Sequence, residues 1–235
     1  MHTIFLTNNV RRENKKDFNC VIFYVTLQNH RTKIIINLQT LIFYMKRSFL
    51  FLAEGFEEIE ALTVVDVMRR AGMDLKTVSI TSEHKVLGAH GIPVLADMLI
   101  SEADLANAEW LIAPGGMPGS TNLASCETLN KALKAHAKAG GKIAAICAAP
   151  AVVLYPLGIL DGKEATCYPG FEGECEDAVM RDTPVVALDN IITANGPATA
   201  LRFALAIVAN SMGEGVAQEV GSGMLHYTRT MNFYF

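Results

Sequence analysis

The sequence predicts an α/β fold in which helices cover both faces of a mainly parallel sheet. Short apolar runs, typical of strands buried on both faces, alternate along the chain with segments of helical periodicity. The 235 residues suffice for one such domain with a sizeable core. A hydrophobic content of 51% against 19% charged residues excludes disorder as a description of the whole chain.

The first strand and helix follow from their apolar patterns. Ser48–Ala53 is a continuous apolar run, as expected of a buried parallel strand. The segment that follows the next loop, up to Ala71, is expected to be a helix, which Gly72 ends as a C-cap. Its apolar side chains recur at helical spacing, at Ile59, Leu62, Val65 and Met68.

The later elements follow from the same two patterns. Strands are expected at Leu75–Thr81, Ile92–Leu95, Trp110–Ala113, Lys142–Ile146, Ala165–Cys167, Val185–Leu188 and Ile191–Thr193. Helices are expected at Leu129–Ala139, Ala148–Leu154, Ala198–Ser211 and Gly215–Val220. In such sheets, functional groups gather at the carboxyl ends of the strands. Three candidates follow strands in this way: the acidic segment Glu54–Glu60, the loop Pro114–Gly119, and Cys147.

Residues 1–44 differ from the rest of the chain. They contain no Gly, Ala, Pro or Ser and carry six Lys/Arg against two Asp/Glu. We expect a non-native or disordered N-terminal extension, with Met45 as the true start and residues 45–235 as the domain. The alternative is a basic β-hairpin or targeting arm, because Val21–Leu27 and Lys33–Tyr44 have a strand-like composition.

Composition also excludes several classes of protein. Residues 45–235 hold 14 Lys/Arg and 22 Asp/Glu, which argues against a nucleic-acid partner. No run reaches the ~18 apolar residues of a membrane span, and no secretion signal is visible. The five cysteines lack CxxC or zinc-finger spacing. We therefore expect a cytoplasmic protein with reduced thiols, no metal site and no membrane partner.

Cys147 is the candidate nucleophile. It stands between a predicted strand and a predicted helix, where free N–H groups and the helix dipole favour a thiolate. Its small neighbours Ala145, Ala148 and Ala149 permit the sharp turn that presents a side chain. The alternative is an inert core cysteine. The thiols without this setting are interpreted as structural or incidental: Cys126, Cys167 and Cys175.

Glu60 is the candidate acid. Acidic residues favour helix N-termini, and that explanation suffices for Glu57 and Glu58. Glu60 instead shares a helical stripe with apolar Val64 and Val67, so its carboxyl is expected to be desolvated and its pKa raised. A protonated carboxyl near Cys147 would donate a hydrogen bond and transfer protons.

The glycines of the loop 113–119 are candidate oxyanion donors, because glycine lets backbone N–H groups approach a reacting oxygen. The loop lacks the Gly-Lys-Ser/Thr of a P-loop, and it is not GxGxxG. A plain turn is the alternative.

Together these motifs resemble the DJ-1/ThiJ/PfpI superfamily, and more closely its DJ-1/ThiJ branch. The similarity runs from Lys46 to about Val220. It rests on AEGFEEIEA (53–61), VDVMRRAG (65–72), APGGMPGSTNL (113–123), AAICAAP (144–150) and ANGPATALRFALAIV (194–208). The resemblance implies a flavodoxin-like three-layer α/β/α sandwich that forms a homodimer.

The resemblance also implies roles for individual residues. Cys147 would be the nucleophile, Glu60 the acid bonded to it, and the N–H groups of Gly116 and Ala148 the oxyanion donors. The substrate-binding residues would be Gly115 and His90, and the loop near His90 is expected to reach the partner's active site.

Two departures limit the chemistry that the resemblance implies. The peptidase-like PfpI branch has His directly after the nucleophile, whereas this chain has Ala148, so a protease mechanism is not expected. Many DJ-1 proteins carry a His in the following strand, where this chain has Tyr168.

The resemblance implies a cofactor-independent lyase or hydrolase of the glyoxalase III or deglycase type. Its substrates would be small reactive carbonyls, such as glyoxal and methylglyoxal, or glycated proteins. The alternative is a non-enzymatic redox sensor or chaperone-like stress protein that uses oxidation of Cys147. The same residues predict both functions.

Overall fold

The computed structural model describes residues 20–27, 30–37 and 46–226, and the chain divides into two units, Met1–Lys46 and Arg47–Phe235. In the first unit, β1 (Cys20–Leu27) pairs antiparallel with β2 (His30–Asn37). This hairpin includes the strand-like run Val21–Leu27 and part of the run Lys33–Tyr44, and both interpretations of residues 1–44 stay predictions. Residues 38–45 lie outside the described residues, and Met45 as the true start stays a prediction.

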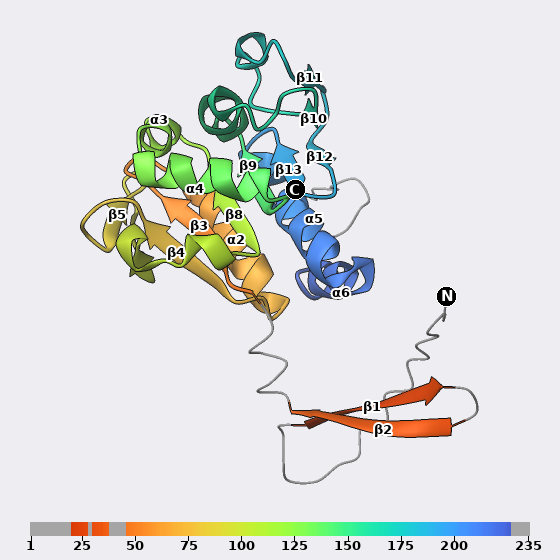
Figure 1. The fold of residues 1–235 in the computed structure, drawn as a ribbon. Coiled ribbons are helices and arrows are strands. Elements are labelled where there is room, and N and C mark those ends of the chain that lie inside the picture. The colour runs from red at the N-terminus through yellow and green to blue at the C-terminus, as the bar shows by residue number, and fades with distance from the viewer. Residues whose placement is uncertain (1–19, 28–29, 38–45, 227–235) are drawn as a thin grey trace, which may run out of the picture. The chain divides into compact units, whose positions relative to one another are not determined.

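A seven-stranded sheet forms the centre of the second unit (Figure 1). In spatial order its strands are β12 (Val185–Ala187), β13 (Ile191–Ala194), β9 (Lys142–Ile146), β8 (Trp110–Ala113), β3 (Ser48–Leu52), β4 (Leu75–Ser79) and β7 (Met98–Leu99). All neighbouring pairs are parallel except β12 with β13. The prediction of a mainly parallel sheet is confirmed.

Alternating side chains on β3 explain why helices cover both faces of the sheet. Leu50 and Leu52 belong to one buried cluster, whereas Phe49 and Phe51 belong to another. The first cluster packs under α2 (Glu58–Arg70), α5 (Ala200–Met212) and α6 (Glu214–Gly223). The second packs under α3 (Gly119–Ala124) and α4 (Glu127–Lys138), and α4 crosses in front of the sheet in Figure 1. The result is the expected α/β/α sandwich.

The shortest elements depart from the prediction. The strand expected at Ile92–Leu95 is β6 (Pro93–Leu95), which pairs antiparallel with β5 (Lys85–Leu87) outside the main sheet. β10 (Glu164–Ala165) pairs with β11 (Val179–Met180) in a separate two-stranded sheet. Two- and three-residue strands are too short to show a period, so the sequence pattern did not predict β5, β7 or β11.

The segment after Cys147 is not the α-helix that was expected at Ala148–Leu154. It is one π-helical turn, Pro150–Leu154, followed by the 3-10 turn Tyr155–Leu157. Pro156 lacks the N–H group that an α-helix continuing through this segment would need at that position. The dipole that this short segment directs at Cys147 is therefore weaker than the one predicted.

The described residues of the second unit also form four further 3-10 turns: Ile100–Glu102, Leu105–Asn107, Glu172–Glu174 and Pro197–Thr199. Within the described ranges, no helix has the length and apolarity needed to cross a lipid bilayer.

Candidate active site

The three candidate groups meet at one edge of the sheet because β3, β8 and β9 are adjacent strands. The chain passes from β3 to β4 on one side, and β8 lies on the other side of β3. The strand order thus reverses between β3 and β8, which is where sheets of this kind bind ligands. Glu60 follows β3, Gly115 and Gly116 follow β8, and Cys147 directly follows β9.

Cys147 has a left-handed backbone, with a φ of 65°. This conformation costs a residue with a β-carbon roughly 1–2 kcal/mol. Two hydrogen bonds hold it: the Cys147 N–H donates to the Ala194 carbonyl at 2.9 Å, and the Cys147 carbonyl accepts from the Tyr168 N–H at 2.8 Å. The residue is 8% exposed, so the turn presents the sulfur to a confined space. The predicted strand–turn transition is present, and the backbone of Cys147 is strained there.

The electrostatics of Cys147 differ from the prediction of a stabilised thiolate. Burial, together with the charge and hydrogen bond of Glu60, raises the pKa of the Cys147 thiol to about 12. The N–H groups of Gly116 and Ala148 point at the sulfur and lower this pKa, but they do not outweigh burial. While Glu60 is ionised, Cys147 is therefore a thiol at neutral pH.

Glu60 lies in the predicted environment. Its side chain is fully buried on the apolar face of α2, beside Val64 and Val67. Burial is the largest influence on its pKa, which is raised to about 7, while hydrogen bonds with Gly115 and Cys147 act in the opposite direction. Among the described residues, Oε1 has no hydrogen-bond partner, while the Cys147 thiol lowers the pKa of Glu60 as a hydrogen-bonding neighbour of this carboxyl. The two groups form one proton-sharing pair.

Gly115 and Gly116 make different contacts in the glycine loop. The Gly115 N–H donates to Oε2 of Glu60 at 2.7 Å and so holds the acid, while substrate binding by Gly115 stays a prediction. A methyl group at Gly115 would lie 2.5 Å from Cβ of Cys147. Gly116 has a φ of 90° and turns its N–H toward the sulfur of Cys147. The N–H of Ala148 points to the same sulfur. These are the two N–H groups predicted to be oxyanion donors, and that role stays a prediction.

The other acids at this helix start have structural roles. Glu57 is the N-cap of α2, and its Oε2 accepts the Glu60 N–H at 2.8 Å. Glu58 accepts both the backbone N–H and the Nδ1 of His90, each at 2.8 Å. Burial raises the pKa of Glu58, but the bonds from His90 outweigh it, so the pKa lies below its usual value. The Glu58 hydrogen bond in turn raises the pKa of His90.

Glu57, Glu58 and His90 are also the one group of described residues whose ligand atoms are close enough to surround a metal ion, within 4.8 Å of one another. The N-cap and the His90 ion pair already account for their proximity. The His90 side chain is 69% exposed, and whether it reaches a partner's active site stays a prediction.

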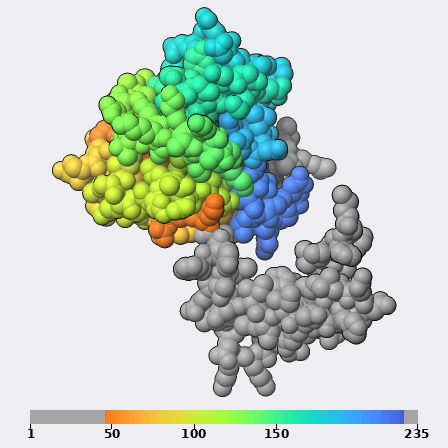
Figure 2. All heavy atoms as spheres, in the orientation of Figure 1, coloured from red at the N-terminus to blue at the C-terminus, as the bar shows by residue number. Residues whose placement is uncertain are grey.

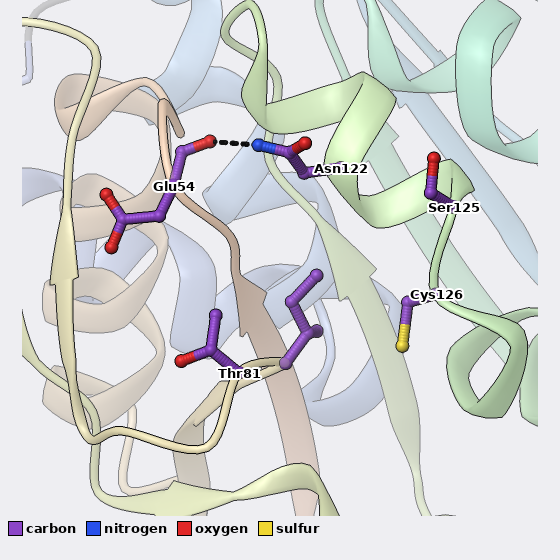
Figure 3. A pocket seen from close by; sticks show the side chains of 6 residues that line it. Glu54, Thr81, Asn122, Ser125 and Cys126 are labelled. Atoms are coloured by element: carbon purple, nitrogen blue, oxygen red, sulfur yellow. Dashed lines mark hydrogen bonds between the residues drawn. The ribbon is translucent and has the colours of Figure 1, made fainter.

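The pKa values of Cys147 and Glu60 are not shifted by Cys126, Cys167 or Cys175. Cys167 and Cys175 are buried together, and burial raises their pKa values to about 12 and about 11. Cys126 lies in an open pocket of about 400 Å³ shown in Figure 3, with Thr81, Ser125 and Glu54, whose carbonyl accepts from Asn122 at 2.8 Å. Cys147 and Glu60 do not line this pocket. Cys126 is thus a half-buried thiol away from the proton-sharing pair.

Comparisons with known proteins agree with the fold. A family model described as the DJ-1/PfpI family matches residues 46–210. A Caenorhabditis elegans protein named a glutathione-independent glyoxalase is 35% identical over 66% of this chain and 82% of its own length. The solved structure of Toxoplasma gondii DJ-1 in an oxidised form has a TM-score of 0.75 and 33% identity, and it covers 77% of this chain and 98% of that one.

Two Arabidopsis thaliana proteins named DJ-1 homologs A and B are each 34% identical over 77% of this chain. The chain spans 47% and 41% of their respective lengths. The similarity to these two relatives therefore concerns only part of each protein.

Proposed function

This chain belongs to the DJ-1/PfpI family, and on that basis we propose that it converts 2-oxoaldehydes into 2-hydroxy acids through Cys147 and Glu60. One observation carries the proposal: a buried carboxyl with a pKa of about 7 lies beside a sulfur that two backbone N–H groups face. A group with this pKa both accepts and donates a proton near neutral pH. The worm relative, named a glyoxalase, supports the same substrate class.

The reaction begins with the proton that the pair shares. Ionised Glu60 takes the thiol proton as Sγ of Cys147 adds to the aldehyde carbon, so a thiolate exists only during attack. The aldehyde oxygen becomes an oxyanion that the N–H groups of Gly116 and Ala148 stabilise. Proton transfer from Glu60 to this oxygen completes a hemithioacetal.

Glu60 then moves a proton between two carbons of the substrate. Its carboxylate removes the C–H proton of the hemithioacetal carbon and delivers a proton to the neighbouring carbonyl carbon. The hydroxyl proton of the hemithioacetal passes to the neighbouring carbonyl oxygen at the same stage, and a thioester of the 2-hydroxy acid results. Water adds to the thioester, the C–S bond breaks, and the thiol regains its proton. The net reaction adds one water to the 2-oxoaldehyde, and early adducts of these aldehydes with proteins present the same reactive carbons.

The test uses methylglyoxal with the full chain. We expect consumption of methylglyoxal and formation of lactate without added cofactor, and a loss of at least about a thousandfold in Cys147→Ala. Cys126→Ser is the matched control, because it removes a thiol outside the pair and leaves the acid and its neighbours unchanged. Equal turnover by wild type and Cys147→Ala would refute the proposal.

We also propose that the chain acts as a homodimer. Large apolar side chains are exposed along α2 and the β5–β6 hairpin: Ile59, Leu62, Leu87, Ile92 and Leu95. Leu95 is 75% exposed, and such a patch is typical of an interface. Sedimentation is expected to give a dimer for the wild type and a monomer for Leu95→Lys, and a wild-type monomer would contradict this.

Redox sensing by Cys147 is the second candidate, favoured by the oxidised form of the Toxoplasma relative. It ranks lower because a thiol with a pKa of about 12 reacts slowly with peroxide. Mass spectrometry after mild peroxide treatment tests it: selective oxidation of Cys147 supports sensing, and oxidation of Cys126 alone excludes it.

A further inference from the structure

A second pocket, of about 380 Å³, lies at the opposite end of β9 from Cys147. Its walls come from the end of α4 and from the segments before β10 and around the start of β13. In Figure 2 the green atoms around residue 130 adjoin the blue-green atoms around residue 160. A five-residue strand separates this pocket from Cys147 by about 13 Å or more.

The pocket is cationic. Lys134, Lys138 and Lys163 line it together with Asn190, and no carboxylate is among the lining residues. In the described part of the chain, none of these lysines has an ion-pair partner within 4.0 Å. The concentration of charge is unusual here, because residues 45–235 hold 14 Lys/Arg against 22 Asp/Glu.

The spacing of two of the lysines is unfavourable for the helix, so helix stability does not explain their placement. Lys134 and Lys138 are four residues apart on α4, and like charges at this spacing repel each other. The helix C-terminus favours Lys138 through the macrodipole, but this reason does not extend to Lys163, which comes from another segment. Three lysines from two segments therefore line one cavity.

We propose that this pocket binds a small organic phosphate. Lysine ammonium groups are point charges that suit phosphate, and no arginine is present for the bidentate geometry of a carboxylate. Leu157 and Ile159 supply apolar walls for the organic part of the ligand. The Asn190 amide offers both a donor and an acceptor. The volume falls within the ~300–1,000 Å³ of small-molecule sites.

One of the lysines is already oriented. Nζ of Lys163 donates to the Ile159 carbonyl at 2.9 Å, which leaves two of its three N–H groups for a ligand. Two negative groups oppose an anion nearby. One is the carboxylate of Asp161, which lies beside the lining residue Gly158: a methyl group added at Gly158 would be 3.1 Å from Oδ2 of Asp161. The other is the C-terminal end of α4, which carries about half a negative charge. Three ammonium charges exceed both.

Calorimetric titration of the full chain at low salt with ADP, inorganic pyrophosphate and adenosine tests the proposal. We expect saturable binding of ADP, weaker binding of pyrophosphate, which lacks the organic part, and none of adenosine. Each of Lys134→Gln, Lys138→Gln and Lys163→Gln is expected to weaken ADP binding about threefold to fivefold. Asp161→Asn is expected to strengthen it.

The matched control is Lys131→Gln. Lys131 lies on the same helix, paired with Glu127 at 3.2 Å, and does not line the pocket. Absence of saturable ADP binding, or an equal loss in Lys131→Gln, would overturn the proposal. We expect Cys147→Ala to bind ADP as the wild type does, so the outcome of this titration does not depend on the proposed catalytic function.

Discussion

The two ends of β9 place reactive groups in opposite environments. At its carboxyl end, Cys147 and the fully buried Glu60 lie in a confined site where burial raises both pKa values. At its amino end, three lysines surround an open pocket, and Lys134 and Lys138 are exposed. One end thus obtains its chemistry from desolvation and the other from accumulated charge.

The two ends also differ in how much they reduce the free energy of unfolding. Removing a carboxylate from water and holding a cysteine in the left-handed region both oppose folding. Exposed lysines cost only their mutual repulsion, which water and salt weaken. We therefore expect substitutions at the carboxyl end to change stability strongly and those at the amino end to change it little.

The largest effect is expected from Gly115→Ala. The added methyl would lie 2.5 Å from Cβ of Cys147 and 2.7 Å from Oε2 of Glu60, so the site must shift. We expect urea denaturation to show a loss of about 3 kcal/mol in the free energy of unfolding. Gly173→Ala, where a methyl meets no atom within 4 Å, is the control. Equal losses in both variants would remove the claim that the carboxyl end is tightly packed.

The next effect is a pH dependence caused by Glu60. Its folded pKa of about 7 lies above the ordinary value of 4.5, so the folded protein holds a proton that the unfolded chain releases. This proton contributes up to about 3 kcal/mol to the free energy of unfolding. The contribution is fully present below about pH 4.5 and is lost as the pH rises through about 7.

Glu60→Gln is expected to lack this loss, as measured by urea denaturation from pH 4.5 to 8. Glu127→Gln, which changes an 85% exposed carboxylate on α4, is expected to keep the wild-type profile. An unchanged profile in Glu60→Gln would mean that the carboxyl is not desolvated.

A smaller effect isolates the backbone strain at Cys147. Cys147→Gly is expected to be about 1 kcal/mol more stable than Cys147→Ala, because only glycine adopts a φ of 65° without cost. The same exchange at Ala135, inside α4, is expected to have the opposite sign, since glycine weakens a helix by about 1 kcal/mol. Thermal unfolding of Cys147→Gly, Cys147→Ala, the wild type and Ala135→Gly measures both differences in stability. If glycine changes stability with the same sign at both positions, backbone strain at Cys147 is excluded.

The smallest effect is expected at the amino end. Lys134→Gln removes the repulsion from Lys138 and is expected to raise the free energy of unfolding by about 0.3 kcal/mol at low salt. Lys131→Gln, which breaks the pair with Glu127, is expected to lower it by a similar amount. A loss above about 1 kcal/mol in Lys134→Gln would show that the pocket lysines support the fold.

Local patterns in the sequence were enough to predict the sheet, most of its helices and the three segments that meet at its carboxyl edge. Apolar runs and helical periods depend on residues close together in the chain, and a parallel sheet brings the ends of its strands to one edge. The environment of Glu60 was predictable for the same reason, because Val64 and Val67 share its helical stripe.

Tertiary structure decided how these groups interact. The Gly115 N–H holds Glu60 across 55 residues of sequence, and the high pKa of the Cys147 thiol follows from burial by several segments. The lysine pocket likewise joins α4 to residues near 160 and 190, which no local period relates. Sequence patterns record which residues face the core, whereas pKa values and pockets depend on the distances between segments that only folding brings together.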